Sequence, residues 1–427
     1  MTWVETRLKR LCVDSGQYGL NISADQYSSS GVRLIRTSDI ASNGALKAST
    51  QGVFVDVPLE QRHRLLPGDV LLSRSGTLGR SFLVPAEASG HSFAGFLIRF
   101  RPKGGVDPRF LYYATQSSPF QGVVHSEAVS STIQNFNADR YANIPLRAPG
   151  AGEQLRIADF LDAETARIDR LAAARDAQLS ALEERELAVI GHMLSGGATS
   201  QGGRSTDWPW LPHIPANWSI GPVYAYYSTD LGKMLNPERA SGEKLRPYLR
   251  NANVHWYEIN TADMASMHFE ADEVRRYSVA PGDLLVCEGG AGVAEAAVWD
   301  GRIEECYFQK SLHRVRQSSE VPVEWLMHWL RFAKACGVFD ASGNLATIPH
   351  LTGEQLRQCR IPIPHDGQRL IRETSRRIGD MAKARTLLNR AQKRLSERRQ
   401  ALITAAVTGQ FDVSTASGRN VTDGVTA

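Results

Sequence analysis

The feature that most constrains the fold of this 427-residue chain is an internal repeat whose period is close to half its length. Arg36 recurs as Arg250, and Pro67-Gly68-Asp69-Val70-Leu71-Leu72 recurs as Pro281-Gly282-Asp283-Leu284-Leu285-Val286. The other landmarks, in the same order and at nearly the same offset, are Trp3 with Trp218, Thr132-Ile133 with Thr347-Ile348, Ile144-Pro145-Leu146 with Ile361-Pro362-Ile363, and Gln154 with Gln368. This self-similarity indicates one structural unit used twice, with a shared scaffold and different displayed residues.

Each copy begins with a globular part, predicted over residues 1–152 and 218–365. Both parts are rich in Gly, Pro, Ser and short apolar runs, which are typical of strands joined by turns. Pro-Gly-Asp followed by an apolar triplet predicts a turn that leads into a strand. Further strands are predicted at Val53-Phe54-Val55, Phe82-Leu83-Val84 and Phe96-Leu97-Ile98, and short helices at Leu111-Tyr112-Tyr113 and Trp325-Leu326-Met327-His328-Trp329-Leu330. The expected fold class is therefore α+β.

Each globular part is followed by a long helix, predicted over residues 153–195 and 366–409. Apolar residues recur along both stretches at the spacing of a coiled-coil seam. Because a lone apolar seam must be buried against another surface, we expect the two helices to pair antiparallel as a spacer between the globular domains. The predicted seam residues are Ile157, Leu161, Ile168, Leu171, Leu182 and Val189 in the first helix, and Ile371, Ile378, Met381, Leu388, Leu395 and Leu402 in the second.

The two predicted helices carry opposite net charge, the first acidic and the second strongly basic. Pairing has two alternatives: each helix packs separately on its own domain, or the basic helix lies on DNA phosphates. Charge reversal at Arg390, Lys393 and Arg394 is expected to separate them. Loss of the fold indicates pairing, and loss of DNA affinity alone indicates phosphate contact.

The remaining segments predict a soluble chain without a metal centre. Residues 196–217 contain glycine pairs and prolines and predict a linker, and residues 410–427 predict a disordered tail. No apolar run approaches the roughly 18–20 residues of a membrane span, and the start lacks a signal pattern, so we expect a cytoplasmic protein. The five cysteines are scattered without a Cys-x-x-Cys pair, which disfavours disulfides and zinc.

The most specific motifs are found where each globular part meets its helix. The first junction reads Ser131-Thr132-Ile133-Gln134-Asn135-Phe136, then Ile144-Pro145-Leu146, then Glu153-Gln154-Leu155-Arg156-Ile157-Ala158-Asp159-Phe160-Leu161-Asp162. The second reads Ala346-Thr347-Ile348-Pro349-His350-Leu351, then Ile361-Pro362-Ile363-Pro364. With these motifs, the chain resembles the specificity (S) subunits of type I restriction-modification systems over essentially its whole length. It departs from their pattern at Gly367-Gln368, where the family usually has a Glu-Gln pair.

This resemblance implies a sequence-specific DNA-binding subunit with two target-recognition domains, each reading one half of a bipartite target. The helices would set the spacing and dock two modification (methyltransferase) subunits, which methylate one adenine in each half-site. Restriction subunits would complete an ATP-dependent endonuclease. S-adenosylmethionine, ATP and Mg²⁺ are expected on those partner subunits and none on this chain.

The chemistry of a self-contained enzyme is not visible in the sequence. The nearest string to the (Asp/Asn/Ser)-Pro-Pro-aromatic motif of adenine methyltransferases is Ser118-Pro119-Phe120, which lacks the second proline. Gly289-Gly290-Ala291-Gly292 is not followed by the Gly-Lys-Ser/Thr of a phosphate loop. A cryptic DNA-modifying enzyme and a coiled-coil adaptor that binds only proteins remain as alternative functions. Methyl transfer by the isolated chain would favour the first, and failure to bind DNA with modification subunits present would favour the second.

Candidate DNA contacts lie on polar loops near the repeated landmarks, because the donors and acceptors of Arg, Lys, Asn, Gln and Ser side chains match those of base edges. Arg36 and Arg250 recur at equivalent positions, which is also what a scaffold residue would show. The predicted contacts are Arg36, Ser38, Arg74, Ser75, Thr77 and Asn135 in the first globular part, and Arg250, Asn251, Asn253, Glu288 and Lys310 in the second.

Overall fold

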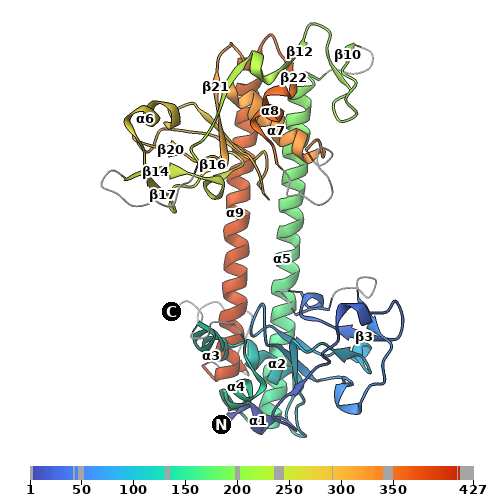
Figure 1. Ribbon diagram of the computed structural model, residues 1–427. Coiled ribbons are helices and arrows are strands. Elements are labelled where there is room, and N and C mark those ends of the chain that lie inside the picture. Colours follow the sequence, from blue (N-terminus) through green and yellow to red (C-terminus); the bar gives the residue numbers. More distant parts are fainter. Residues whose placement is uncertain are drawn as a thin grey trace. The chain divides into compact units, whose positions relative to one another are not determined.

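The computed structural model describes residues 3–41, 44–46, 52–129, 135–197, 202–234, 245–290, 292–339, 350–410 and 412–413 (Figure 1). The chain divides into two compact units: unit 1 comprises Met1–Ala177 and Leu388–Ala427, and unit 2 comprises Gln178–Leu387. Each unit contains one globular head and a segment of both long helices, α5 (Ala151–Leu194) and α9 (Gly367–Thr408). The landmarks Thr132-Ile133 and Thr347-Ile348, and the predicted tail apart from residues 410 and 412–413, lie outside the described residues.

The head of unit 1 is built on three small sheets. One sheet has the order β2-β8-β5-β6, a second has the order β4-β3-β7, and β1 pairs with β9. All described pairs are antiparallel except β3 with β7. The elements are β1 Val4–Arg7, α1 Leu8–Leu11, β2 Gln17–Tyr18, β3 Val32–Ile35, β4 Val53–Val55, β5 Val70–Ser73, β6 Ser81–Leu83, β7 Ser92–Phe93, β8 Leu97–Phe100, α2 Pro108–Gln116, α3 Ser118–Val129, α4 Ala138–Asn143 and β9 Pro145–Ala148.

The head of unit 2 repeats these three sheets and adds two two-stranded sheets, β10-β11 and β15-β16. Its sheets have the orders β13-β21-β18-β19 and β17-β14-β20, β12 pairs with β22, and the pair β14–β20 is parallel as β3–β7 is. The predicted α+β class and internal repeat are thus confirmed. The elements are β10 Gly203–Ser205, β11 His213–Pro215, β12 Ser219–Pro222, β13 Tyr227–Leu231, β14 Leu245–Leu249, β15 Val254–His255, β16 Glu258–Ile259, β17 Ala265–His268, α6 Ala271–Tyr277, β18 Leu284–Cys287, β19 Ala296–Val298, β20 Tyr307–Phe308, β21 Leu312–Gln317, α7 Val323–Ala335, α8 Gly353–Gln358 and β22 Arg360–Ile363.

A buried aspartate explains why Pro-Gly-Asp recurs. In unit 1, Asp69 is 1% exposed and accepts the backbone N–H of Leu66 at 2.8 Å. The Arg101 guanidinium donates to both carboxylate oxygens of Asp69, at 2.7 and 2.8 Å. The preceding glycine, Gly68, has a φ of 89°, which a side chain would strain. The turn is therefore locked directly before the central strand β5.

Unit 2 repeats this arrangement at Asp283. Its carboxylate accepts the backbone N–H of Ala280 at 2.7 Å, and Arg316 donates to its two oxygens at 2.6 and 2.9 Å. Gly282 has a φ of 91°. The repeated landmark is a scaffold device that starts the equivalent strands β5 and β18.

The landmark Gln154, in contrast, has a role that Gln368 does not repeat. Gln154 is 4% exposed, accepts the backbone N–H of Asp107 at 3.0 Å and donates to the carbonyl of Pro149 at 2.8 Å. It joins the start of α5 to the start of α2, whose N-cap is Asp107. Gln368 is exposed, so the sequence match at this pair does not extend to its contacts.

Within each unit, α5 and α9 run antiparallel and bury most of the predicted seam. In unit 1, Gln392 hydrogen-bonds Ala172 and Asp176, and Arg399 pairs with Asp169 at 3.3 Å. The buried seam residues are Ile157, Leu161, Ile168 and Leu402 in unit 1, and Val189, Ile371, Ile378 and Met381 in unit 2. Leu182, Leu388 and Leu395 are half-buried.

Leu171 corrects the predicted seam, because its side chain is 46% exposed. The contact at this level is made instead by the backbone of Ala172, which accepts a hydrogen bond from Gln392 at 3.2 Å. Because α9 presents polar side chains such as Gln392 at this level, the spacing of apolar residues in α5 does not determine which of its residues face α9.

A buried carboxylate joins the two helices of unit 2 to their head. Glu186 of α5 is fully buried and accepts from Arg385 of α9 and, at 3.3 Å, from Arg331 of α7. Arg331 also pairs with Glu183 at 2.6 Å. The opposite charges of the two helices therefore form ion pairs between α5 and α9 at a few positions, of which Glu186 is fully buried.

The basic residues Arg390, Lys393 and Arg394 are exposed on α9 in unit 1. Among the described residues, the pairing of the helices uses Arg385 and Arg399 instead. Charge reversal at these three exposed positions is therefore expected to leave pairing intact, and such a variant tests phosphate contact alone.

The helix α9 ends directly before a glycine. Gly409 has a φ of 73°, and Gln410 donates to the carbonyl of Ala405 at 2.9 Å, as expected for a glycine that ends a helix.

In the described ranges, no helix has both the length and the hydropathy that crossing a bilayer requires.

Replacing Asp283 by Asn should lower the stability of unit 2 by about 3 kcal/mol, because Arg316 and the Ala280 N–H lose a buried charged partner. Urea unfolding followed by tryptophan fluorescence measures this effect, since seven of the eight tryptophans belong to unit 2. The control is Asp300→Asn, whose bidentate pair with Arg302 lies on the surface and should leave the midpoint nearly unchanged. Equal shifts in the two variants would contradict the scaffold role.

Replacing Glu186 by Gln should also destabilise unit 2 by about 3 kcal/mol, because two arginines would then face a neutral group in a buried site. The neighbouring Glu184 is exposed on the same helix and provides the matched control, Glu184→Gln. Both are measured by the same fluorescence-detected unfolding. A Glu186→Gln variant as stable as Glu184→Gln would show that this ion pair contributes nothing to helix pairing.

Candidate nucleic-acid interface

The candidate interface of unit 1 centres on Arg74, the first residue of the loop between β5 and β6. Its backbone is fixed from both sides: its N–H donates to the carbonyl of Phe96 at 2.9 Å, and its carbonyl accepts from Phe136 at 2.9 Å. Ser75 and Asn135 form an isolated antiparallel bridge beside it. The structure thus brings together Arg74, Ser75 and Asn135, which are predicted contacts from distant parts of the sequence.

Unit 2 holds Glu288 in the same backbone frame. The N–H of Glu288 donates to the carbonyl of Ser311 at 2.9 Å, and its carbonyl accepts from Leu351 at 2.6 Å. Gly289 and His350 form the corresponding bridge. Glu288 therefore occupies in unit 2 the position that Arg74 occupies in unit 1.

The Arg74 side chain is oriented by two neighbours. Its Nε donates to Asn135 Oδ1 at 3.1 Å, and its guanidinium carbon lies 4.9 Å from the centre of the Tyr18 ring. No described residue accepts a hydrogen bond from its two terminal amino groups. The donor fork is thus held in place while its outer edge is available to a ligand.

The Glu288 side chain is half-buried and presents acceptors only. In the described part of unit 2, no hydrogen bond or ion pair engages its carboxylate. Beneath it, His313 is 1% exposed and its Nε2 lies 2.8 Å from the carbonyl of Leu351. Burial lowers the pKa of His313, so the ring is neutral at pH 7 and donates from Nε2.

Asn251 joins the same cluster in unit 2. Its backbone N–H donates to Ser311 Oγ at 3.3 Å, and its Nδ2 donates to the carbonyl of Gly289 at 2.8 Å. Its Oδ1 is buried without a hydrogen-bond partner. Lys310 is exposed beside Ser311, so three of the predicted contacts of this head (Asn251, Glu288 and Lys310) lie close together.

Around these positions the two heads differ in side-chain chemistry. Phe96 is 60% exposed where unit 2 has Ser311, and Tyr18 is 37% exposed where unit 2 has Leu231. Strand register places Tyr18 and Leu231 at equivalent positions. Tyr18 pairs with Ile98 in β8, and Leu231 pairs with His313, which is the equivalent residue of β21. One frame therefore presents a cation against the Tyr18 ring in unit 1 and an acid near Ser311 and Asn251 in unit 2.

Arg36 and Arg250 recur because they start equivalent 3₁₀ turns. The backbone N–H of Arg36 donates to Asp39 at 2.9 Å, and that of Arg250 donates to Asn253 at 3.0 Å. The Arg36 guanidinium is bound by Asp39, and Arg250 Nη2 donates to Asp263 at 2.8 Å. Their assignment as base contacts stays a prediction, but their recurrence is explained by the scaffold.

Asn253 corrects the predicted set. It is 1% exposed, and its Nδ2 donates to the carbonyls of Asn260 and Asp263, both at 2.9 Å. Its side chain is therefore fully engaged inside the head and has no route to a base. Ser38 and Thr77, in contrast, are exposed on the surface of unit 1.

A buried phenol pins the loop of unit 1 from below. The hydroxyl of Tyr141 donates to the carbonyl of Ser73 at 2.7 Å and accepts from the N–H of Gly79 at 3.0 Å. Burial raises the pKa of Tyr141, so the phenol stays protonated and keeps its donor. Arg80 Nη1 adds a bond to the carbonyl of Ile40 at 2.8 Å and ties the loop to the turn that follows Arg36.

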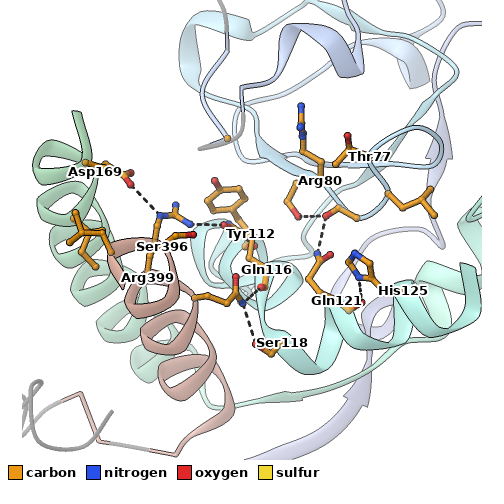
Figure 2. Close-up of a pocket in the computed structure, with 18 of the residues that line it drawn as sticks. Thr77, Arg80, Tyr112, Gln116, Ser118, Gln121, His125, Asp169, Ser396 and Arg399 are labelled. Carbon is orange, nitrogen blue, oxygen red and sulfur yellow. Dashed lines mark hydrogen bonds and ion pairs between the residues drawn. The ribbon is translucent and has the colours of Figure 1, made fainter. Parts of the chain in front are cut away.

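The same loop borders a pocket of about 950 Å³ in unit 1 (Figure 2). Its labelled polar residues mostly bond one another: Arg399 pairs with Asp169 and donates to Gln116 at 3.3 Å, and Gln121 donates to the carbonyl of Gly79 at 2.9 Å. These bonds connect head and helices within the unit, so we assign the pocket no ligand. In the described ranges, no three His, Cys, Asp or Glu residues are grouped as metal ligands would be.

Three residues of the interface, Tyr18, Phe96 and His350, are not predicted by the sequence analysis. An alignment of the two copies could have found Phe96, because Phe93 and Leu97 match Phe308 and Leu312 while the residues between them differ. Tyr18 and His350 reach the cluster through strand register and an isolated bridge, which no local sequence pattern reveals.

Replacing Tyr141 by Phe should leave the fold of unit 1 intact and loosen its loop at a cost of about 1 kcal/mol, because the carbonyl of Ser73 and the N–H of Gly79 would keep only their mutual bond at 3.3 Å. Hydrogen–deuterium exchange measures this directly, and the amide of Gly79 should exchange faster. Tyr224→Phe, at a side chain that is 52% exposed, is the control. Unchanged protection of Gly79 would contradict the pinning role of the phenol.

Residues 26–181 match the family model described as the type I restriction modification DNA specificity domain. The chain is 24% identical over 277 residues to the specificity subunit of the type I restriction enzyme EcoKI from Escherichia coli (strain K12). It is 27% identical over 277 residues to the specificity subunit of the StySPI enzyme from Salmonella potsdam. Each match covers 63% of this chain and 56% of the relative, so the chain spans about half the length of these curated relatives.

A solved structure, described as the structural basis of complex assembly and conformational transition of the type I R-M system, contains a chain of the same fold. The two chains superpose with a TM-score of 0.64 at 16% identity, over 96% of this chain and 98% of that chain. At this identity the likeness shows the fold alone. Together, the domain match over residues 26–181 and the named relatives support the resemblance: this chain is similar to the specificity subunits of type I restriction-modification systems.

Proposed function

We propose that this chain is the DNA-specificity subunit of a type I restriction-modification complex, and that each head reads one half of a bipartite target. The observation that carries the proposal is one backbone frame, present twice, with different chemistry at its displayed positions. Arg74 and Glu288 have equivalent backbone hydrogen bonds and opposite charge. A scaffold that is repeated within the chain and displays different polar groups is what two different half-site sequences require, because phosphate contacts carry no sequence information and base-edge contacts do.

The long helices supply the second part of the proposal. From residue 169 to residue 185 no side chain of α5 is buried, and the same holds for α9 from residue 382 to residue 401. These stretches include exposed leucines, Leu171 and Leu387, at 46% and 64% exposure. We propose that they dock two methyltransferase subunits and that the helix length sets the spacing between the half-sites, with restriction subunits joining the complex.

On this proposal the chain itself is non-catalytic and works in the cytoplasm. S-adenosylmethionine, ATP and Mg²⁺ would be bound by the partner subunits. The interface described above supports this division of tasks, because its side chains offer donors, acceptors and aromatic rings for binding double-stranded DNA.

Co-expression with the modification subunits of the same system, followed by methylation mapping of genomic DNA, tests the function. We expect methylated adenines in one split motif, and we expect them to disappear when this chain is omitted. Purified chain alone, incubated with S-adenosylmethionine and the same DNA, is the control for cryptic catalysis and should transfer no methyl groups. Methylation that persists without this chain would refute the specificity role and favour an adaptor function.

A further inference from the structure

Arg74 and Glu288 differ in a way that is informative about the target. They share their backbone frame, so a base presented to the two heads in the same way would meet a donor fork in unit 1 and a pair of acceptor oxygens in unit 2. Neither group is neutralised by its own head: the terminal amino groups of Arg74 and the carboxylate of Glu288 have no hydrogen-bond partner among the described residues.

The geometry of Arg74 suits one base in particular. Its Nε is occupied by Asn135 and its plane is supported by Tyr18, which leaves the two parallel terminal N–H groups. Two parallel donors match two adjacent acceptors, and guanine presents O6 and N7 side by side in the major groove. Adenine and cytosine each place an amino group on this edge, and that amino group would face an arginine donor.

The chemistry of Glu288 selects a different base. A carboxylate only accepts, so it requires an exocyclic amino group. Cytosine presents its N4 amino group without a neighbouring major-groove acceptor, whereas adenine adds N7, whose lone pair would repel the second carboxylate oxygen. Thymine and guanine offer no major-groove donor.

We propose that Arg74 reads a guanine in the half-site of unit 1 and that Glu288 reads a cytosine in the half-site of unit 2. The proposal rests on the function proposed above and adds the identity of one base in each half-site. It also assigns Tyr18 and Asn135 as positioning residues, which restrict Arg74 to one orientation and reduce the entropy lost on binding.

The test uses the full complex with its modification subunits and starts from the motif that methylation mapping yields. Arg74→Gln should relax the preference at one guanine of one half-site by about 5- to 150-fold and leave the other half-site unchanged. Glu288→Gln should relax one cytosine of the other half-site by a similar factor. Arg62→Gln and Glu304→Gln, at exposed residues of the same units, are the matched controls and should leave the motif unchanged.

Base analogues give a second measurement that needs no variant to fold. In duplexes of the mapped motif, 7-deazaguanine removes N7 and 2-pyrimidinone removes the 4-amino group. The wild-type complex should bind less tightly when the analogue replaces the proposed base, and Arg74→Gln should be insensitive to 7-deazaguanine at that position.

The outcomes separate this inference from the function on which it rests. A motif that depends on the chain, but lacks a guanine in one half-site or a cytosine in the other, overturns the base assignment and leaves the specificity role standing. Variants that change the base preference at no position, or that change it in both half-sites, also overturn the base assignment and leave the specificity role standing. A methylation pattern that does not depend on the chain overturns both.

Discussion

The bidentate pair between a buried aspartate and a partly exposed arginine is the interaction on which the rest of each head depends. Asp69 with Arg101, and Asp283 with Arg316, close the turn directly before the central strand of the four-stranded sheet. Desolvating a carboxylate is costly, and the two charge-assisted bonds from the guanidinium compensate only in a well-defined geometry. That requirement fixes where β5 and β18 begin, and hence where the loops that follow them emerge.

The sequence predicts the parts of the fold that have local causes. Helical periodicity places both long helices, and the recurrence of Pro-Gly-Asp places the equivalent strands in both heads. It cannot give the sheet orders, because the pairing of β2 with β8 and of β1 with β9 joins segments that are far apart in the chain. The prediction that Leu171 is part of the buried seam fails for a related reason. The residues of α9 that face this level are polar, and they contact Ala172 while Leu171 stays exposed.

For the interface, choosing polar residues near turns predicts some residues that lie together at the candidate interface and others that support the scaffold. Arg74, Ser75 and Asn135 do converge, while Asn253 is an internal support and Arg36 is bound by its neighbour Asp39. An asparagine that displays its amide and one that holds a turn look alike in sequence. The difference lies in the partners offered by other segments, such as the carbonyls of Asn260 and Asp263, and these become visible only once the chain is folded.

The presence of both copies in one chain has a consequence for symmetry. Had a single copy assembled as a homodimer, both heads would carry identical side chains, and two-fold symmetry would restrict the assembly to palindromic ligands. Covalent duplication removes that restriction, because a substitution at Arg74 leaves Glu288 untouched. Each copy is free to diverge at its displayed positions while the aspartate–arginine frame keeps both copies foldable, so an asymmetric target becomes accessible without a new architecture.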